Sequence, residues 1–312
     1  MRAIGVTAFG DEDNLEVLDL PTPEPGAGEV RIRVHFATVN PTDTKLIRGA
    51  YGPEMQGETG PWVPGMDVAG EIDAVGDGVT DLAVGDRVMA IVAPSGSHGA
   101  YADHVVVPAL SAITVPQGID LDAASTLPMN GLTAQVSLDQ LGLEEGSTLA
   151  VTGAAGCYGG YVVQLAKTRG LAVVADAKDD DVALVESLGA DEVLTRGSEF
   201  AGRVRQSHPD GVDGLADGSV QHGEVVDAVK DGGGMAVIRP YADDPGRGVT
   251  VHTTFVFDHI TRQDWLRELA HLAKQGDVTL RVNRVLPAED AAEAHRLLAG
   301  GGIRGRLVLD LR

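Results

Sequence analysis

Three glycines at regular intervals carry the clearest chemical signal in the sequence. Residues 148–170 read TLAVTGAAGCYGGYVVQLAKTRG, with the glycines between an apolar run and a helix-like stretch. Without side chains, the chain can turn sharply and its N–H groups can approach a ligand closely. The following helix directs the positive end of its dipole at the same place. The pattern therefore predicts a loop that binds the paired phosphates of a dinucleotide, formed by Gly153, Ala154, Ala155, Gly156, Cys157, Tyr158 and Gly159.

The elements around this loop would hold it in place. Residues 148–152 predict a strand, the helix after the loop has an apolar face that includes Val162 and Val163, and residues 171–175 predict a second strand. The glycines alone would also suit a tight turn in any α/β domain. Strand, helix and second strand together favour a βαβ nucleotide site.

Charged residues of both signs follow the second strand. An acid about 20 residues beyond the glycines would hold the ribose hydroxyls of NAD, and Asp176 stands near that position. Lys178 and Arg196 would instead suit the 2′-phosphate of NADP. Each of the three also suits a plain solvent-exposed charge. We favour NADP(H) as the cofactor, with NAD(H) as the alternative.

The hydrophobic pattern of the sequence changes near residue 122. Before it, short alternating runs predict strands, at 29–36, 68–75 and 86–91. After it, helix-length amphipathic stretches alternate with compact apolar strands, at 148–152, 171–175, 192–194 and 235–238. This alternation predicts βαβ units and a parallel sheet. Strand-like runs at 281–286 and 306–311, with a helix at 288–298, resemble the first part, so we expect the chain to return to it.

Composition and charge exclude several classes of partner. The 312 residues are 43% hydrophobic, which is enough for about two domains, and the net charge is −22. Lys and Arg are scattered singly, so the field of the protein repels phosphate backbones and anionic membranes. We expect neither a nucleic-acid nor a membrane partner.

Cysteine and histidine usage limits redox and metal chemistry. Cys157 is the only cysteine, which excludes an internal disulfide and a cysteine-rich zinc site and favours a reducing cytoplasm. No run of about 18 apolar residues occurs, and the N-terminal MRAIGVTAFG lacks a signal-peptide pattern. His98, His104, His222 and the other histidines are dispersed, so we expect surface histidines and no metal site.

Many segments in a fixed order carry a family resemblance. They are VNPTD from Val39, RGAYG from Arg48, PGMDVAGEIDAVGDGV from Pro64, VGDRV from Val84, GAYADHVVVP from Gly99, LPMNGLTA from Leu127, VTGAAGCYGGYVVQLAK from Val151, SLGADEVL from Ser187, and AAEAHRLL and RGRLVLDL near the end. With them the chain resembles, nearly end to end, the zinc-independent quinone oxidoreductase branch of the medium-chain dehydrogenase/reductase superfamily.

The resemblance implies a fold of the α/β class. A GroES-like, partly open β-barrel catalytic domain, residues 1–122 and 278–312, would be interrupted by a Rossmann domain with a doubly wound parallel sheet, residues 123–277. The active site would lie in the cleft between these domains. Family members are commonly homodimers or homotetramers, so the resemblance implies one of these states.

The resemblance also assigns roles to residues. Asn40 and Tyr51 become the catalytic candidates, as polar partners of the acceptor or the cofactor, and Asp43 would orient their loop. The alternative is that these are turn residues that satisfy local backbone groups. Cofactor contacts beyond the glycine loop are assigned to Thr133, Lys178, Arg196, Ile238, Phe255, Val256, Phe257, Arg304 and Arg306.

Zinc chemistry is not expected. Zinc-dependent relatives bind their catalytic metal with a Cys, a His-Glu pair and a later Cys or acid, whereas here the VNPTD segment and Met66–Asp67 take the first positions. The implied activity is hydride transfer from NADPH to a quinone or an α,β-unsaturated carbonyl, whose conjugated oxygen takes the charge. The alternatives are a reductase of alkenal or enoyl-thioester double bonds, and a crystallin-like NADPH-binding protein with little turnover.

Three parts of the sequence depart from the family pattern. Cys157–Tyr158 replaces the usual Gly-Val, so the phosphate loop is bulkier, and the phenol would either contact the cofactor or obstruct it. Arg239 replaces a glycine, and residues 214–223, GLADGSVQHG, lack the fuller apolar strand expected after Asp213. These departures bear on cofactor affinity more than on fold.

Overall fold

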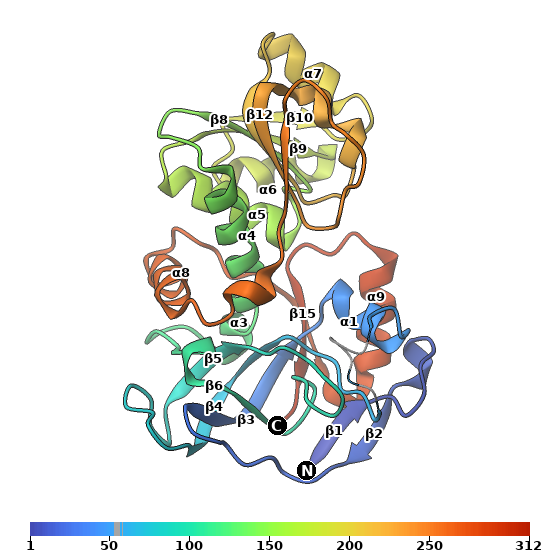
Figure 1. Cartoon of the computed structure of the whole chain (residues 1–312), viewed down its shortest axis with the longest axis vertical. Coiled ribbons are helices and arrows are strands. Elements are labelled where there is room, and N and C mark those ends of the chain that lie inside the picture. The colour runs from blue at the N-terminus through green and yellow to red at the C-terminus, as the bar shows by residue number, and fades with distance from the viewer. Residues whose placement is uncertain (53–56, 58) are drawn as a thin grey trace. The chain divides into compact units, whose positions relative to one another are not determined.

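The computed structural model describes residues 1–52, 57 and 59–312, and the chain forms two compact units (Figure 1). The first unit comprises Met1–Met129, Ile260–Lys274 and Leu280–Arg312, and the second comprises Asn130–His259 and Gln275–Thr279.

A seven-stranded sheet forms the frame of the first unit. Its order is β14-β15-β3-β4-β5-β7, with β6 paired to β3, and all neighbours are antiparallel except β14 and β15. The strands are β3 Glu29–Thr38, β4 Asp67–Val75, β5 Arg87–Ile91, β6 His104–Pro108, β7 Ala112–Thr114, β14 Val282–Pro287 and β15 Arg306–Asp310. A separate pair joins β1 Arg2–Gly5 to β2 Glu16–Asp19. The return of the chain end to this unit, expected from the sequence, is confirmed because β15 pairs with β3.

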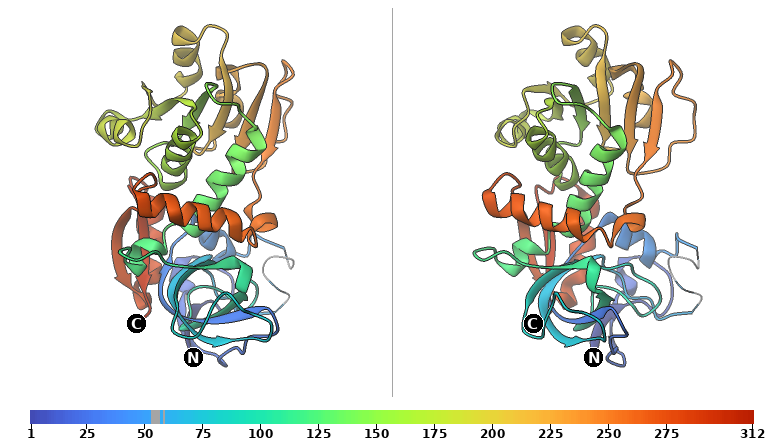
Figure 2. Two further views of the ribbon diagram at one scale, coloured as in Figure 1. Left: turned by 90° about the vertical axis from the view of Figure 1, so that its left-hand side faces the viewer. Right: turned by 60° about the vertical axis from the view of Figure 1, so that its left-hand side comes forward.

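Alternation within the strands builds the core of the first unit. In β3, Val30, Ile32 and Val34 are buried whereas Arg33 is exposed, because successive side chains point to opposite faces. The helices of this unit are α1 Pro41–Ile47, α3 Leu121–Ala124, α8 Gln263–Gln275 and α9 Ala291–Gly300, with 3₁₀ turns η1 Glu12–Asn14, η2 Ala109–Ser111 and η7 Ala288–Asp290. Figure 2 shows α8 running along one side of the unit, and its residues Leu266, Leu269 and Ala270 are buried.

Six parallel strands form the sheet of the second unit. They are β8 Thr148–Thr152, β9 Ala172–Ala177, β10 Glu192–Thr195, β11 Val212–Asp217, β12 Val229–Val237 and β13 Thr250–Thr253. Their order is β10-β9-β8-β11-β12-β13, the 3-2-1-4-5-6 order of a Rossmann sheet. The order reverses between β8 and β11, and ligands of such sheets bind at the carboxyl ends of the strands beside that point.

Helices in this unit follow the predicted βαβ alternation only in part. They are α4 Pro128–Leu141, α5 Cys157–Thr168, α6 Val182–Ser187 and α7 Phe200–Ser207, with 3₁₀ turns η3 Asp179–Asp181, η4 His222–Glu224, η5 Val226–Ala228 and η6 Val256–His259. Only the short turns η4 and η5 lie between β11 and β12. Helix α5 is buried from Cys157 to Ala166, and it ends where Gly170 takes a positive φ of 72°.

The segment after Asp213 is a strand only in part. Residues 214–217 complete β11, which pairs with both β8 and β12 at the centre of the sheet, whereas residues 218–223 form the following loop and the start of η4. A central strand is buried on both faces, so it shows no alternation, and glycine lowers its strand propensity further. Gly214 is accommodated against the Leu143 side chain, where an added methyl group would lie 3.0 Å from Cδ1.

Helix α8 groups with the first unit, although the predicted boundaries 123–277 placed it with the nucleotide-binding domain. Its first residue, Gln263, donates from Nε2 to the carbonyl oxygens of Ala109 and Ala112 at 3.3 and 3.1 Å. These tertiary contacts join segments more than 150 residues apart, so the local pattern of the helix did not reveal them.

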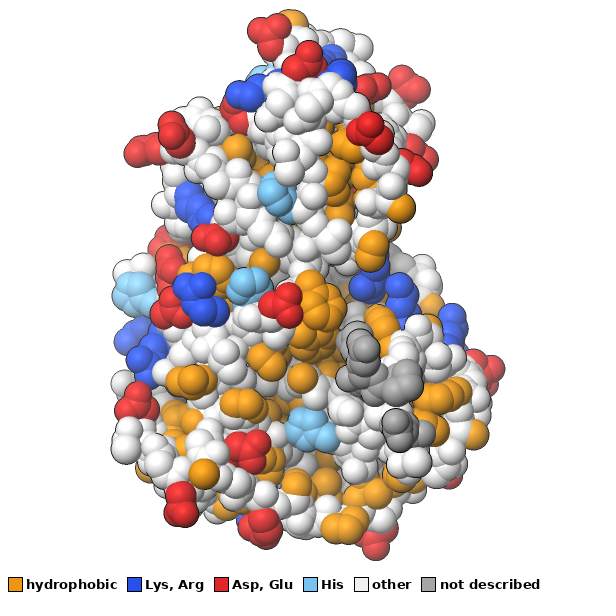
Figure 3. Space-filling model, viewed as in Figure 1, with side chains coloured by type: hydrophobic (Ala, Val, Ile, Leu, Met, Phe, Trp, Pro, Cys, Tyr) orange, Lys and Arg blue, Asp and Glu red, His pale blue; other side chains and the backbone are white. Residues whose placement is uncertain are grey.

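The surface agrees with the acidic composition. Asp and Glu side chains are spread over the face shown in Figure 3 rather than gathered into one patch. Among the helices of the described residues, none is both long enough and apolar enough to cross a membrane.

Candidate functional site

The glycine loop lies directly after β8, at the carboxyl end of a central strand. Gly153 has a φ of 69°, and the N–H of Gly156 donates to its carbonyl oxygen at 2.9 Å. A methyl group on Gly159 would lie 2.3 Å from the same oxygen, and one on Gly153 would lie 3.0 Å from the carbonyl carbon of Gly218. Backbone contacts therefore require glycine at these positions. Helix α5 begins at Cys157, so its N-terminal N–H groups lie at this loop.

The phenol of Tyr158 points into the second unit. Its hydroxyl lies 2.8 Å from Ser137 Oγ, which lies 3.0 Å from Thr254 Oγ1, and Thr254 donates to Gln140 Oε1 at 3.0 Å. Burial raises the pKa of Tyr158 above its ordinary value, so the phenol stays neutral. The substitution of a bulky residue in the loop thus creates a buried hydrogen-bond chain that ties α5 to α4 and to the segment after β13.

Two buried residues at the carboxyl ends of β8 and β11 were missed by the sequence analysis. Thr152 Oγ1 donates to Asp217 Oδ1 at 2.7 Å, and the N–H of His222 donates to Asp217 Oδ2 at 2.8 Å. In the loop that follows, Val220 and His222 have φ values of 59° and 51°, which L residues rarely adopt. Such backbone strain is common at functional sites. The position of Asp217 at the end of a strand could have indicated a site residue, but the sequence analysis did not predict a full strand there.

At the end of β9, Asp176 is buried and Lys178 is exposed. Asp176 is 1% exposed, and its Oδ1 accepts from the N–H of Ala154 at 3.1 Å while its Oδ2 lies 3.7 Å from Arg196 Nε. Burial raises the pKa of Asp176, which the loop N–H and Arg196 oppose. Lys178 is exposed, and no ion pair within the described residues involves it. Asp176 therefore holds the glycine loop, and Lys178 is left facing solvent.

The other predicted cofactor residues of the second unit follow β12 and β13. Ile238 comes directly after β12, and Phe255 is 47% exposed after β13 with its ring 5.6 Å from that of Phe257. Val256 is buried within η6, and Thr133 is half-buried on α4. Since β12 pairs in parallel with β11 and β13 pairs in parallel with β12, the residues after these strands lie at the same edge of the sheet as the glycine loop.

Asn40 lies in a buried polar cluster of the first unit. Arg306 Nη2 donates to Asn40 Oδ1 at 2.7 Å and to Asp67 Oδ2 at 3.2 Å, and Asn40 Nδ2 donates to Asp67 Oδ2 at 2.9 Å. The exposed fractions of Asn40, Asp67 and Arg306 are 3%, 0% and 5%. Burial raises the pKa of Asp67, and the Arg306 guanidinium is the largest opposing effect. The sequence placed Arg306 at a cofactor phosphate, whereas in the structure its guanidinium fixes the amide of Asn40.

A second buried chain holds the loop that carries Asn40. Asp43 accepts from the N–H groups of Asn40 and Gly65 at 2.8 and 3.1 Å and from the Tyr101 hydroxyl at 3.1 Å. His295 Nε2 lies 3.3 Å from that hydroxyl, and its Nδ1 lies 2.9 Å from Thr44 Oγ1. Asp43 therefore orients the loop, as expected. His295 is 0% exposed, so the expectation of a surface histidine is wrong for this residue.

The buried hydrogen-bond chain that includes Asp43 and His295 predicts that the stability of the fold depends on pH. Burial lowers the pKa of His295 from 6.5 to about 4, so only the unfolded chain is protonated there between these values and stability rises with pH. Burial raises the pKa of Asp43 from 3.8 to about 7, so the folded chain keeps a proton that the unfolded chain has lost, and this contribution disappears as pH rises. The two slopes oppose each other between pH 4 and 6.5.

We expect His295→Gln to remove the rise of stability with pH that His295 contributes, and to leave the opposing contribution of Asp43. Relative to the wild type, the free energy of unfolding of the variant will fall with rising pH, by up to about 1.4 kcal/mol per pH unit. Urea unfolding at several values between about pH 5 and 6.5 measures this difference. His208→Gln is the control, because that side chain is part-exposed beside Glu192. A parallel pH profile for His295→Gln and the wild type would contradict the assignment.

The remaining predicted residues lie in the first unit. Tyr51 is half-buried after α1, and no described contact joins it to Asn40. Arg304 is half-buried, and its Nη1 donates to the carbonyl oxygen of Ile303 at 3.1 Å. Over residues 1–52, 57 and 59–312, no group of three or more His, Cys, Asp or Glu side chains is placed to hold a metal ion.

Fold and site together define a class of protein. A unit with a largely antiparallel sheet is joined to a Rossmann unit whose glycine loop suits a dinucleotide, an arrangement of nicotinamide-dependent oxidoreductases. Residues 26–117 match the family described as alcohol dehydrogenase GroES-like domain, and residues 188–309 match the family described as zinc-binding dehydrogenase.

Solved structures agree over the whole chain. A mycobacterial quinone oxidoreductase is 30% identical over 99% of both chains, with a TM-score of 0.83. A mycobacterial protein complexed with NADPH is 29% identical over 99% of this chain and 100% of that one, with a TM-score of 0.86. An NAD-dependent alcohol dehydrogenase is 29% identical over 100% of both chains, also with a TM-score of 0.86.

A curated relative matches a shorter region. The chloroplast envelope quinone oxidoreductase homolog of Arabidopsis thaliana is 35% identical over 201 residues, which are 62% of this chain and 60% of the relative. The chain thus spans less than two thirds of the length of that relative. From these matches and the fold, the chain belongs to the medium-chain dehydrogenase/reductase superfamily of oxidoreductases.

Proposed function

We propose that the protein is an NADPH-dependent, zinc-independent reductase that transfers a hydride to a quinone or an α,β-unsaturated carbonyl compound. The observation that carries the proposal is the glycine loop at the carboxyl end of β8, where backbone contacts at Gly153 and Gly159 exclude side chains. Its N–H groups and the start of α5 suit a pyrophosphate. The likeness to a mycobacterial protein complexed with NADPH supports the same cofactor.

The choice of NADP(H) over NAD(H) rests on the end of β9. Asp176 is 1% exposed, and its Oδ1 accepts from the N–H of Ala154, so this carboxylate oxygen is used to hold the glycine loop. Lys178 is exposed, and Arg196 is 41% exposed beside it in the sheet, since β10 pairs with β9. Together they suit a 2′-phosphate.

In this proposal the residues of the first unit orient the acceptor and the cofactor. Bound NADPH would supply the hydride. Both amide hydrogens of Asn40 are directed at Asp67 and at the carbonyl oxygen of Thr38, and Arg306 donates to its Oδ1. These contacts fix the amide of Asn40 at the start of α1, so in this proposal its role is to position the loop that leads to Tyr51. The hydroxyl of Tyr51 is the proposed donor to the acceptor oxygen, where charge develops.

The donors of this chain do not fit a catalytic zinc ion. Asp67 is held by Arg306, Asn40 and the N–H of Met129, so a cation there would have to displace a guanidinium. The thiol of Cys157 is buried in the phosphate loop of the other unit. We propose that activity needs no metal. The family resemblance further supports a homodimer or homotetramer, and the single cysteine supports a cytoplasmic location.

A direct assay tests the activity. The purified protein is mixed with NADPH and a panel of quinones, enones and alkenals, and the nicotinamide absorbance is followed with and without a strong chelator. We expect oxidation with quinones or enones at a rate that chelator leaves unchanged. Turnover of alkenals or enoyl thioesters alone would favour a double-bond reductase instead. Binding of NADPH without turnover of any acceptor would favour a crystallin-like role, and a chelator-sensitive rate would refute the zinc-free mechanism.

We also expect Gly159→Ala to lose cofactor binding. The added methyl group would lie 2.3 Å from the Gly153 carbonyl oxygen, so the loop must shift away from the geometry that binds phosphate. The dissociation constant for NADPH, measured by calorimetry, will rise by about 100-fold, equivalent to roughly 2.7 kcal/mol. Gly202→Ala is the matched control, because the nearest atom to its added methyl group is 3.9 Å away on exposed helix α7. Equal affinity for the two variants would refute the loop assignment.

A further inference from the structure

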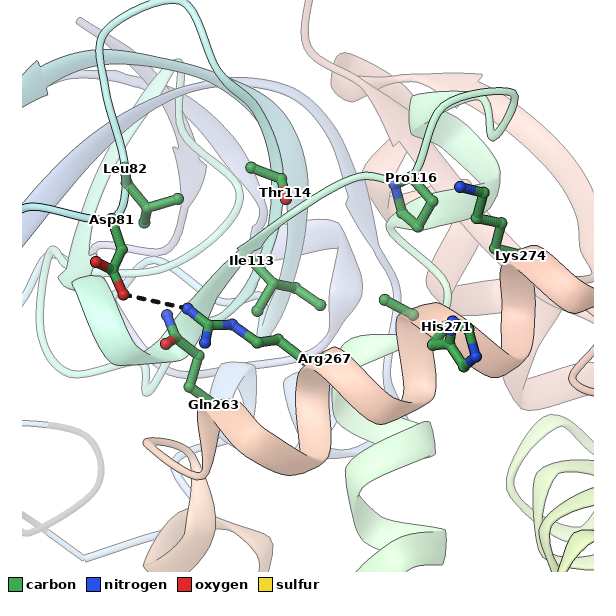
Figure 4. Close-up of a pocket in the computed structure, with 10 residues that line it drawn as sticks. Asp81, Leu82, Ile113, Thr114, Pro116, Gln263, Arg267, His271 and Lys274 are labelled. Atoms are coloured by element: carbon green, nitrogen blue, oxygen red, sulfur yellow. Dashed lines mark hydrogen bonds and ion pairs between the residues drawn. The ribbon is translucent and has the colours of Figure 1, made fainter.

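A pocket of about 280 Å³ lies on the first unit between helix α8 and the segment around β7 (Figure 4). One wall is formed by residues of α8, namely Gln263, Arg267, Ala270, His271 and Lys274. The other wall is formed by Asp81, Leu82, Ile113, Thr114 and Pro116. None of these residues is among those proposed for the cofactor or the acceptor, so this pocket needs a separate account.

The pocket has a small apolar floor and a basic rim. Leu82, Ile113 and Ala270 are 7%, 4% and 5% exposed, so they form the buried base. Arg267, His271 and Lys274 are exposed. The last three follow one another at spacings of four and three residues, which places them on one face of the helix. Figure 4 shows these side chains projecting from α8 on the side of the pocket.

The basic groups are available to a ligand. Arg267 Nη2 lies 3.3 Å from Asp81 Oδ2, and the two side chains are 58% and 63% exposed, so this pair is weak and exchanges readily. Lys274 has no ion-pair partner in the part of the chain that the structure describes. Two basic side chains beside one acid are unusual in a chain with 24 basic and 46 acidic residues. Local charge at the rim therefore attracts an anion against the field of the whole protein.

We propose that this pocket binds a small organic carboxylate with one apolar ring, the benzoate class. Arg267 would bind the carboxylate, since a guanidinium can donate two parallel hydrogen bonds to it, and Lys274, two turns further along α8, would add positive charge at the rim. The ring would cover Leu82, Ile113 and Ala270 and remove their remaining apolar surface from water. A volume of about 280 Å³ is slightly below the roughly 300 Å³ at which pockets for drug-sized molecules begin, so it suits one ring rather than several.

Calorimetric titration of the full chain tests the proposal with three probes. Benzoate carries both the charge and the ring, benzamide keeps the ring without the charge, and inorganic phosphate keeps charge without the ring. We expect benzoate to bind best. In the double variant Arg267→Gln/Lys274→Gln its affinity will fall by about tenfold or more. Arg33→Gln/Lys230→Gln is the control for the net charge, because both side chains are part-exposed and lie outside the pocket.

A second variant tests the apolar base without changing charge. Ala270→Leu adds a side chain to the base of the pocket, so benzoate binding will be lost while the net charge stays the same. Absence of benzoate binding to the wild type, equal affinity in the double variant, or phosphate binding as tightly as benzoate would each overturn the proposal. NADPH binding is measured on the same samples, so a failure here is distinguishable from a failure of the proposed reductase function.

Discussion

Replacing Arg306 by methionine is expected to lower the free energy of unfolding by about 3–5 kcal/mol, because it leaves a buried carboxylate without its counter-ion. Asp67 is 0% exposed and its Oδ2 accepts from Arg306 Nη2 at 3.2 Å. Methionine has a similar length and no charge, so the loss reports on the ion pair rather than on a large cavity. Urea unfolding followed by circular dichroism measures the change.

Two further variants separate the ion pair from a general effect of substitution. Arg33→Met removes an exposed pair with Glu71, in which the side chains are 52% and 37% exposed, and this change will cost no more than about 1 kcal/mol. Adding Asp67→Asn to Arg306→Met removes the unpaired charge and will recover a large part of the lost stability. If Arg306→Met costs no more than Arg33→Met, the buried pair does not stabilise the fold.

The second large effect is expected on the cofactor. Lys178→Glu will weaken NADPH binding by about 10- to 100-fold, because an anion would replace the exposed cation proposed to face the 2′-phosphate. NADH has no such phosphate, so its affinity will change little. Calorimetric titration with both reduced cofactors measures the ratio of the two dissociation constants.

A control variant tests whether the change in net charge alone alters the ratio of NADPH to NADH affinity. Lys274→Glu makes the same change of two charge units at an exposed position of α8, outside the residues proposed for the cofactor, and it will leave the ratio for NADPH and NADH unchanged. Lys178→Arg keeps the cation and should retain NADPH binding. Equal losses of NADPH and NADH affinity in Lys178→Glu would refute the NADP assignment.

Local sequence was sufficient for the parts of the site that depend on backbone geometry. The predicted strand 148–152 coincides with β8, and the glycines after it have the turn and the close backbone contacts that their spacing implied. Glycine is required where another atom occupies the position that a Cβ would take, and at Gly156 and Gly159 those atoms belong to the loop itself. The general division into a largely antiparallel part and a parallel part was also correct, because strand and helix periodicities are local properties.

Long-range contacts decided the rest. The sequence offered both Asp176 and Lys178 and favoured the second, but only the fold buries the first against Ala154 and leaves the second in solvent. Tyr158 had two possible roles beside the cofactor, yet its hydroxyl bonds Ser137, which is 21 residues away. His295 had no local feature to distinguish it from a surface residue, but contacts with Thr44 and Tyr101 bury it completely.

The sequence by itself determined the glycine loop, the strand and helix on either side of it, and the family. The tertiary structure decided which charged residues are buried, which strand lies at the centre of the parallel sheet, and that Arg306 fixes Asn40. The reason is physical: backbone conformation follows from adjacent residues, whereas the burial and pairing of a side chain depend on segments that meet only after folding, such as Asn40 and Arg306, 266 residues apart.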